Sequence, residues 1–195
     1  MEYIVRMAKK EDIQEILGIY EPYILHTTIT FEYEVPTLEE FEKRLEKIQE
    51  QYPWLVCEIN GEIIGYAYAS AFRARMAFSW GTELSVYTNE KYLGLHIGRI
   101  LYEKLIQLLK EQGYYNVYAL ISIPNEKSIY LHKMLGFEEE GVQKKVGFKL
   151  GKWCDLVYLV KNINRYDEYP KELPRSIQQI EKETIEAILK KRKEL

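Results

Sequence analysis

The sequence predicts a mixed α/β (α+β) domain built on one sheet, and three patterns support this prediction. Strand-like and helix-like segments follow one another in the order β-α-α-β-β-β-α-β-α-β-β. Within 53–72, two apolar runs are joined by Asn60 and Gly61, a pair typical of the type I′ turn of an antiparallel hairpin. At 78–123, a strand, a glycine-containing loop, a helix and an apolar strand form a crossover, which makes the two strands parallel. We therefore expect a mostly antiparallel sheet with a central parallel strand pair, helices on both faces, and a ligand site where the parallel strands separate.

The N-terminal segments predict a strand, a helix and an extended stretch. Alternation predicts a strand at 3–8, and apolar residues at helical spacing predict a helix at 10–24. Pro22 should end or kink this helix early, because proline lacks the backbone N–H that a helix uses. Residues 26–36 are rich in β-branched and aromatic side chains, which favour an extended segment.

A capping-box pattern predicts the second helix. Thr37 and Glu40 have the spacing at which each side chain bonds the other residue's backbone N–H, so a helix should run over 36–48. Apolar periodicity and turn residues predict the remaining elements: a strand at 78–89, a helix at 99–113, a strand at 116–123, a helix at 124–137, and strands around 141–150 and 153–162.

These elements lie within 1–164, which we predict to be one domain, since 195 residues suit a single medium-sized domain. Residues 165–195 begin with a polar linker that contains two prolines and continue as a charged amphipathic helix. Such a helix either packs on its own domain or contacts a second copy of the chain. The sequence leaves both alternatives open.

Composition argues against several kinds of partner. The formal net charge is −3 at pH 7, so no positive field favours nucleic acid. Two cysteines, Cys57 and Cys154, do not form a disulfide framework, and the three histidines have no metal-ligand spacing, so we expect no metal. The N-terminus has no apolar signal core, and no apolar run approaches the ~18 residues of a membrane span. We expect a cytoplasmic protein with no membrane partner.

The stretch NEKYLGLHIGR, residues 89–99, suggests an anion site. A glycine-containing loop between a strand and a helix directs backbone N–H groups and the positive end of the helix at one point, which suits a pyrophosphate. His96 stands where a stronger signature would have a glycine, but histidine adopts left-handed backbone angles more readily than most side chains. Taken alone, such a loop is common.

Several further stretches place this loop in a family context: TTITFEYEVPT, YPWLVCEINGEIIGYAYASAFRARMAFSW, EQGYYNVYALISIPNEKSIYLHKMLGF and VGFKLGKWCD. With them, the chain resembles the GCN5-related N-acetyltransferase (GNAT) superfamily, and within it the phosphinothricin acetyltransferase-like branch, over residues 4–160. The resemblance implies acetyl-CoA as co-substrate, a small-molecule primary amine as acceptor, direct transfer in a ternary complex, and a homodimer.

The resemblance also implies how the co-substrate binds. The loop LGLHIGR would hold the CoA pyrophosphate through backbone N–H groups, and the strand segment LSVY would pair with the pantetheine arm. An oxyanion donor near Ser85 or Val86 would depend on a bulge. The CoA-binding residues implied are Ser85, Val86, Tyr87, Leu93, Gly94, Leu95, His96, Ile97, Gly98 and Arg99, with Asn125 and Ser128 as partners of the pantetheine amides.

Two titratable residues are expected to do the chemistry. The resemblance implies Glu83 as general base, and burial beside Trp80 would raise its pKa to a useful value. The alternative is a glutamate that faces water at a strand end. His132 occupies a position where the superfamily usually has tyrosine and this branch often has histidine, placed to protonate the departing sulfur. The alternative is a packed histidine without a role in catalysis.

Two arginines suggest the kind of acceptor. Arg73 and Arg75 are spaced to share one face of an extended segment, and a guanidinium pair suits a carboxylate or phosphinate. Phe31 and Trp80 are expected to wall the apolar part of this acceptor site, and the alternative for each is a place in the core. The resemblance therefore implies an amino-acid-like acceptor of the phosphinothricin, methionine sulfone or methionine sulfoximine type. A polyamine or protein N-terminus as acceptor, or an acyl-CoA-binding sensor with little turnover, are the alternatives.

Overall fold

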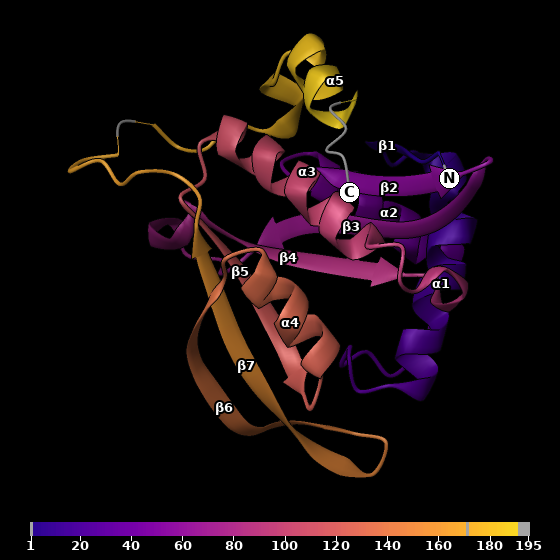
Figure 1. Ribbon diagram of the computed structural model, residues 1–195. Helices are drawn as coiled ribbons and strands as arrows, with labels where there is room; N and C mark the ends of the chain where they lie inside the picture. The colour runs from indigo at the N-terminus through magenta and orange to yellow at the C-terminus, as the bar shows by residue number, and fades with distance from the viewer. Residues whose placement is uncertain (1, 171, 191–195) are drawn as a thin grey trace.

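The computed structural model describes residues 2–170 and 172–190 (Figure 1). In these residues, seven strands form one sheet in the order β1-β2-β3-β4-β5-β7-β6. The strands are β1 (Ile4–Met7), β2 (Trp54–Ile59), β3 (Glu62–Ala71), β4 (Gly81–Thr88), β5 (Asn116–Ile123), β6 (Glu138–Lys149) and β7 (Lys152–Asn162). The α-helices are α1 (Ile13–His26), α2 (Leu38–Gln49), α3 (Ile97–Gln112), α4 (Glu126–Met134) and α5 (Lys182–Lys190).

The sheet confirms the predicted mixture of strand directions. Neighbouring strands pair antiparallel except β4 and β5, which are parallel. Their pairing begins at Gly81 with Asn116 and ends at Glu83 with Tyr118, after which the strands separate. The β2–β3 hairpin has positive φ angles at 60 and 61, as a type I′ turn requires.

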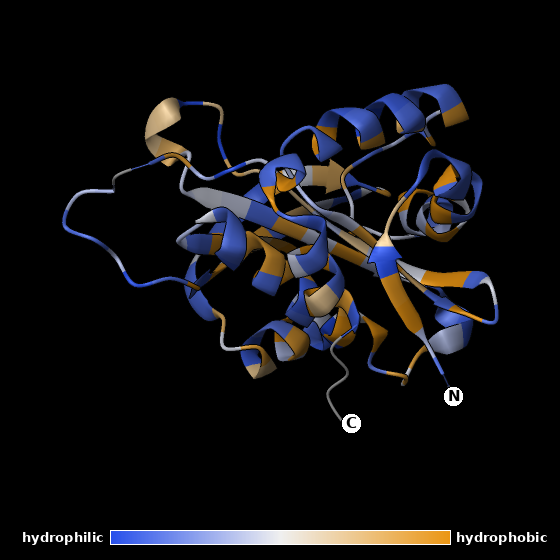
Figure 2. Ribbon diagram, turned by 90° about the horizontal axis from the view of Figure 1, so that it is seen from above, coloured by the Kyte–Doolittle hydropathy of each residue, from blue (hydrophilic) through white to orange (hydrophobic). Residues whose placement is uncertain are grey.

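Helices cover both faces of the sheet, as predicted (Figures 1 and 2). One core cluster, which includes Leu101 and Leu105, lies between α3 and the sheet. The other, which includes Phe41 and Trp54, lies between the sheet and the α1–α2 pair. Figure 2 shows hydrophobic residues along the strands and hydrophilic residues on the outer faces of the helices. The sheet is therefore the central layer of three.

The segment that precedes α2 differs from the sequence prediction. Helix α1 continues through Pro22 to His26. Ile24, one helical turn after the buried Tyr20, is 1% exposed, and its packing in the core stabilises this last part of the helix. Residues 27–36 form an irregular loop and no strand, since their backbone has no neighbouring strand to pair with. The capping box of α2 is confirmed: Thr37 N–H donates to Glu40, and Glu40 N–H donates to Thr37 Oγ1.

The C-terminal segment packs on its own chain, one of the two alternatives that the sequence leaves open. Ile177 and Ile180 are buried in the same core cluster as α3. The Gln112 side-chain amide donates to the backbone oxygens of Gln51 and Arg175, at 2.7 Å each. Helix α5 lies against α3 and β1 (Figure 1). This segment therefore contributes to the stability of the domain.

We expect Ile177→Ala to lower the free energy of unfolding by about 2–5 kcal/mol, because the substitution removes a buried side chain and leaves a cavity. Urea denaturation followed by circular dichroism measures this loss. Glu181→Ala, in the same segment but exposed, is the control and should change stability by less than about 0.5 kcal/mol. Equal, small effects of both substitutions would show that the segment is dispensable for folding.

Candidate active site

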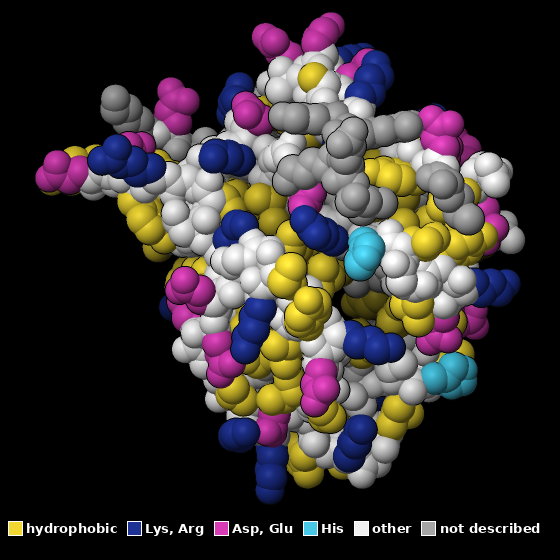
Figure 3. Space-filling model, in the orientation of Figure 1, with side chains coloured by type: hydrophobic (Ala, Val, Ile, Leu, Met, Phe, Trp, Pro, Cys, Tyr) yellow, Lys and Arg dark blue, Asp and Glu magenta, His cyan; other side chains and the backbone are white. Residues whose placement is uncertain are grey.

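A cleft opens where β4 and β5 separate. Its walls come from 84–87 of β4, 119–122 of β5, Tyr102 of α3 and the start of α4, with Ile29 from the loop after α1. The space-filling view shows the surface hollowed at this place, beside the ends of α3 and α4 (Figure 3). The ligand site expected between the parallel strands therefore has a physical counterpart.

Backbone alternation decides which N–H groups of β4 point into this cleft. Asn89 N–H donates to Ile64 O at 2.9 Å, and the register of β3 with β4 is regular over 82–88. In an antiparallel pair, N–H groups alternate between the two edges of a strand, so those of Ser85 and Tyr87 bind β3. The N–H of Val86 points toward the cleft, and no bulge is needed to place it there.

The loop before α3 has the geometry of an anion site. Gly94 and His96 have positive φ angles of 91° and 56°, which confirms that His96 takes the left-handed conformation. The His96 side chain makes no cap, and the first hydrogen bond of α3 runs from Ile100 N–H to His96 O. The N–H groups of residues 97–99 thus have no helical acceptor and are open to a ligand.

Close packing holds the first turn of α3 beside the cleft. A Cβ added at Gly98 would lie 3.3 Å from Leu131 of α4 and 3.7 Å from Val86 of β4, so a glycine lets these elements approach. Arg99 forms an ion pair with Glu103 at 3.1 Å, which partly neutralises its charge. Leu93 is exposed, and Leu95 and Ile97 pack toward the core. The loop therefore presents mainly backbone N–H groups, and few side chains, to a ligand.

Glu83 is the last residue of the parallel ladder with β5. Alternation along β4 puts its side chain on the same face as Gly81 and Ser85. Burial raises the pKa of Glu83 above its ordinary value, because the charged carboxylate loses solvation. The environment thus agrees with the property that a general base at this position requires.

His132 is buried in the wall of the cleft and is 2% exposed. Its Nδ1 lies 2.7 Å from Ser128 O, which can only accept, so Nδ1 carries the proton in the neutral ring. Nε2 is buried without a hydrogen-bond partner, and burial lowers the pKa of His132. The neutral ring therefore has an unpartnered lone pair on Nε2, and the ring packs against Tyr102 and Phe137. Donation of a proton to sulfur, as the sequence led us to expect, requires the imidazolium form.

A further polar group in the cleft was missed by sequence reasoning. Ser122 Oγ is buried without a hydrogen-bond partner and lies in the same cleft as His132. The sequence feature that could have revealed Ser122 is its position as a single serine in the apolar strand NVYALISI. Asn125 caps α4 by accepting from Ser128 N–H at 3.2 Å. Unpaired buried polar atoms are costly, so the partnerless Ser122 and His132 atoms fit a ligand with amide and carbonyl groups, such as a pantetheine thioester.

The predicted acceptor residues do not gather in one place within a single chain. The Arg73 guanidinium lies 5.0 Å from the ring centroids of Phe72 and Phe78, and it lines a depression with Arg75 away from the cleft. A 3₁₀ turn follows the two arginines at 76–78, and Arg75 itself has an extended backbone. Phe31 lies against Gly147 of β6, whereas Trp80 precedes β4 and donates from Nε1 to Glu172 O at 3.1 Å.

The loop over the cleft is tied to the β6–β7 hairpin. Lys149 is buried, and its Nζ donates to Thr30 O at 2.7 Å. Tyr33 OH donates to Phe148 O. These contacts hold Thr30, between Ile29 and Phe31, and Tyr33, so the loop that closes one side of the cleft has a defined position.

Two properties of the described residues bear on the class of protein. Across 2–170 and 172–190, no helix is long and apolar enough to span a membrane. In the same ranges, His, Cys, Asp and Glu do not assemble into a group of three that could hold a metal ion.

Separated parallel strands beside the open N-terminus of a helix form a site that suits an extended ligand with a phosphate group. Known proteins give the class of protein. The chain matches the family model for the acetyltransferase (GNAT) domain over residues 5–158. The chain therefore belongs to the GNAT family, and it is an acetyl-CoA-dependent N-acetyltransferase.

Individual relatives cover most of the chain. It is 36% identical over 152 residues to the phosphinothricin N-acetyltransferase of Streptomyces viridochromogenes, with 78% of this chain and 83% of that protein covered. Identity is 32% over 166 residues with the L-methionine sulfoximine/L-methionine sulfone acetyltransferase of Pseudomonas aeruginosa, covering 84% and 96%. The crystal structure of a GNAT superfamily phosphinothricin acetyltransferase from Sinorhizobium meliloti in complex with AcCoA gives a TM-score of 0.82 at 34% identity, covering 90% of this chain and 100% of that one.

Burial of Glu83 predicts a gain in stability when its charge is removed. Because its pKa is raised on folding, the ionised carboxylate destabilises the folded state at neutral pH, and this cost disappears below the pKa of the unfolded chain, at about pH 4. We expect Glu83→Gln to melt at a higher temperature than the native chain at pH 7 and at nearly the same temperature at pH 4. The exposed Glu139→Gln is the control in calorimetry. A lower melting temperature for Glu83→Gln at pH 7 would contradict the assignment of a buried charge.

Proposed function

We propose that this chain acetylates the primary amine of a small amino-acid-like acceptor of the phosphinothricin, methionine sulfone or methionine sulfoximine type. One observation carries the proposal: Glu83 lies at the point where the parallel strands part, in a setting that raises its pKa. The relatives that share the fold are named for such acceptors. Acetyl-CoA supplies the reactive thioester.

The backbone groups described above bind and orient the co-substrate in this proposal. The N–H groups of 97–99 bind the pyrophosphate, as does the glycine loop before them. The free edge of β4 pairs with the extended pantetheine arm, and Val86 N–H donates to the thioester oxygen, where negative charge develops during transfer. Ser122 Oγ and the Asn125 side chain lie at the edge of the same cleft and are further partners for amide groups.

Glu83 has the principal catalytic role in the proposal. An ammonium has no lone pair, so the Glu83 carboxylate takes one proton from the acceptor nitrogen, directly or through water. The nitrogen then bonds to the acetyl carbon, and the carbon–sulfur bond breaks. The nitrogen gives up its second proton, which passes to the departing sulfur, so that the products are the amide, the thiol and protonated Glu83. His132 stands on the sulfur side: its neutral ring accepts a hydrogen bond from the thiol product at Nε2, and its protonated ring donates to the thiolate.

A homodimer is part of the proposal. The β6–β7 hairpin lies at the edge of the sheet and exposes several large apolar side chains, which in a monomer would form an unusual patch. They are Val146, Phe148, Leu150 and Trp153. A monomeric mass at micromolar concentration in analytical ultracentrifugation would contradict this assembly. Anchoring of the acceptor carboxylate by Arg73 and Arg75 stays a prediction.

We also propose a cytoplasmic location. Cys57 and Cys154 are both buried free thiols, which fits a reducing compartment. Fractionation of the native cells with an antibody against the chain tests the location, and recovery with secreted material would contradict it.

Glu83→Gln is expected to lower kcat/KM by about 10²–10⁴-fold with methionine sulfone, because the amide cannot accept the amine proton. Release of free thiol from acetyl-CoA measures the rate. In the native chain, activity should fall as the pH drops through the raised pKa of Glu83, and this dependence should be absent from the residual rate of the variant.

A panel of amines separates the proposal from its alternatives. Methionine sulfone should turn over faster than spermidine or a peptide with a free N-terminus. Faster turnover of spermidine or the peptide would show that the acceptor is a polyamine or a protein N-terminus. CoA binding without release of thiol from acetyl-CoA in the presence of any of these amines would identify a sensor.

The left-handed backbone of His96 predicts how substitutions there change CoA affinity. His96→Gly should bind acetyl-CoA within about threefold of the native chain, because glycine adopts positive φ freely. His96→Val should bind about tenfold more weakly, since a left-handed β-branched residue costs roughly 1–2 kcal/mol and distorts the loop. Calorimetric titration measures both affinities, and His26→Val, at an exposed helix end, is the control. Equal affinity of the glycine and valine variants would exclude a backbone anion site here.

A further inference from the structure

A second groove lies at the opposite end of the parallel strand pair from the cleft. Its floor is Gly81, where the pairing of β4 with β5 begins. Gly81, Glu83 and Ser85 share one face of β4, so the carboxylate stands between the groove and the cleft, in which Ser85 lies. The cavity volume of the groove is about 200 Å³, and the groove is open to solvent on one side. This space suits a small molecule.

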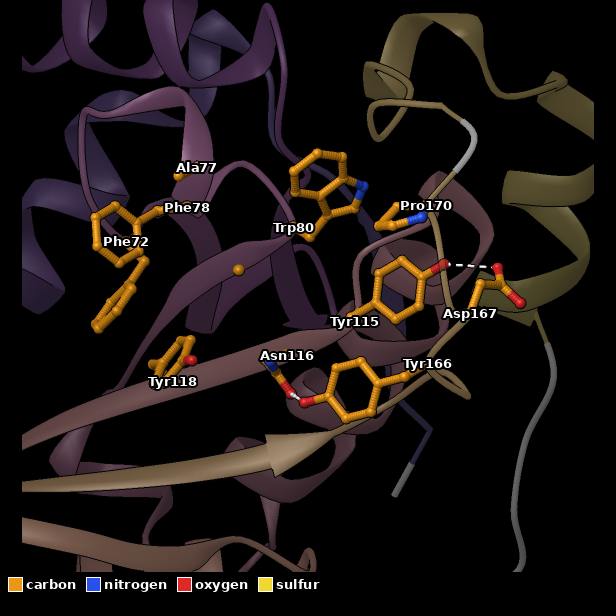
Figure 4. Close-up of a pocket in the computed structure, with 11 residues that line it drawn as sticks. Phe72, Ala77, Phe78, Trp80, Tyr115, Asn116, Tyr118, Tyr166, Asp167 and Pro170 are labelled. Atoms are coloured by element: carbon orange, nitrogen blue, oxygen red, sulfur yellow. Dashed lines mark hydrogen bonds between the residues drawn. The ribbon is translucent and has the colours of Figure 1, made fainter.

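Aromatic side chains form both walls of this groove. Figure 4 shows Phe72, Phe78 and Tyr118 on one side of the gap and Trp80, Tyr115 and Tyr166 on the other. The Phe72 and Tyr118 rings stack with centroids 3.8 Å apart, and those of Tyr115 and Tyr166 stack at 5.7 Å. Aromatic rings carry negative charge on their faces, so the walls attract positive charge.

Among the described residues, the lining of the groove carries one charge, which is negative, and the Arg73 guanidinium lies outside the lining, over two of its rings. Asp167 is the charged residue of the lining in the described parts of the chain, and lysine and arginine are missing from that lining. Its Oδ2 accepts from Tyr115 OH at 2.8 Å (Figure 4). The rings already show an affinity for cations: Arg73 lies 5.0 Å from the centroids of Phe72 and Phe78, in a neighbouring depression that shares Phe78.

The C-terminal segment completes the groove and holds it in shape. Tyr166 and Asp167 lie outside the residues 5–158 that match the family model. Tyr166 OH donates to Asn116 Oδ1 at 2.8 Å, and Trp80 Nε1 donates to Glu172 O at 3.1 Å. Preformed walls reduce the cost of ordering a site when a ligand binds.

We propose that this groove binds a small organic cation with an alkylated ammonium group. The ammonium lies among the faces of the aromatic rings, where it loses water and gains cation–π attraction, and Asp167 supplies the opposite charge. The site is separate from acetyl transfer, since none of the groups to which the reaction is assigned lies in its lining.

Choline is the probe, and 3,3-dimethyl-1-butanol, which has the same shape without the charge, is its matched control. Calorimetric titration of the full chain should show saturable binding of choline and at least about tenfold weaker binding of the alcohol. Equal affinities would reveal an ordinary apolar groove, and absence of saturable choline binding would remove the site. Either result overturns the proposal.

Variants of the C-terminal segment test the location. Asp167→Asn and Tyr166→Ala should each weaken choline binding by about tenfold. Tyr169→Ala is the control, because Tyr169 belongs to the same segment, is 76% exposed and does not line the groove. All three variants should keep native circular dichroism and native acetyl-transfer rates, because the altered side chains lie on the surface. Unchanged choline affinity in Asp167→Asn or in Tyr166→Ala overturns the proposal.

Discussion

The separation of β4 from β5 after Glu83 is the constraint on which the site depends. Each strand is held on its far side, β4 by β3 and β5 by β7, so the divergence leaves one free edge on each. Free backbone groups inside a protein need partners, and a ligand that lies extended between the strands supplies them. Beside this gap, Gly98 allows α3 to approach both β4 and α4 closely. The same gap places a carboxylate at its narrow end.

Burial affects the two titratable groups of the cleft in a coordinated way. The pKa of Glu83 is raised and that of His132 is lowered, so each group is pushed toward its uncharged form. When one of these two groups gains or loses a proton, only one charge is buried in the cleft, because the other group stays neutral. The ionised form of Glu83 lowers the free energy of unfolding at neutral pH, as is common for residues of functional sites.

Local patterns in the sequence predicted the frame well, and long-range contacts explain where they failed. The hairpin, the crossover, the capping box and the left-handed His96 depend on residues close in sequence, so the pattern was sufficient. The position of Arg73 depends on Phe78 and on a turn that folds back, and the alternation of two arginines could not show it. Burial of Ile177 depends on α3, which is far away in the chain.

The left-handed His96 has a consequence for the recognition of distant relatives. A search pattern that demands glycine at this position treats backbone freedom as a property of one amino acid, although asparagine, aspartate and histidine share part of it. A homologue with any of these four residues keeps the shape of the loop, whereas one with valine or isoleucine does not. Alignments scored by permitted torsion angle, in place of residue identity, would therefore recover members of the family that a strict motif discards.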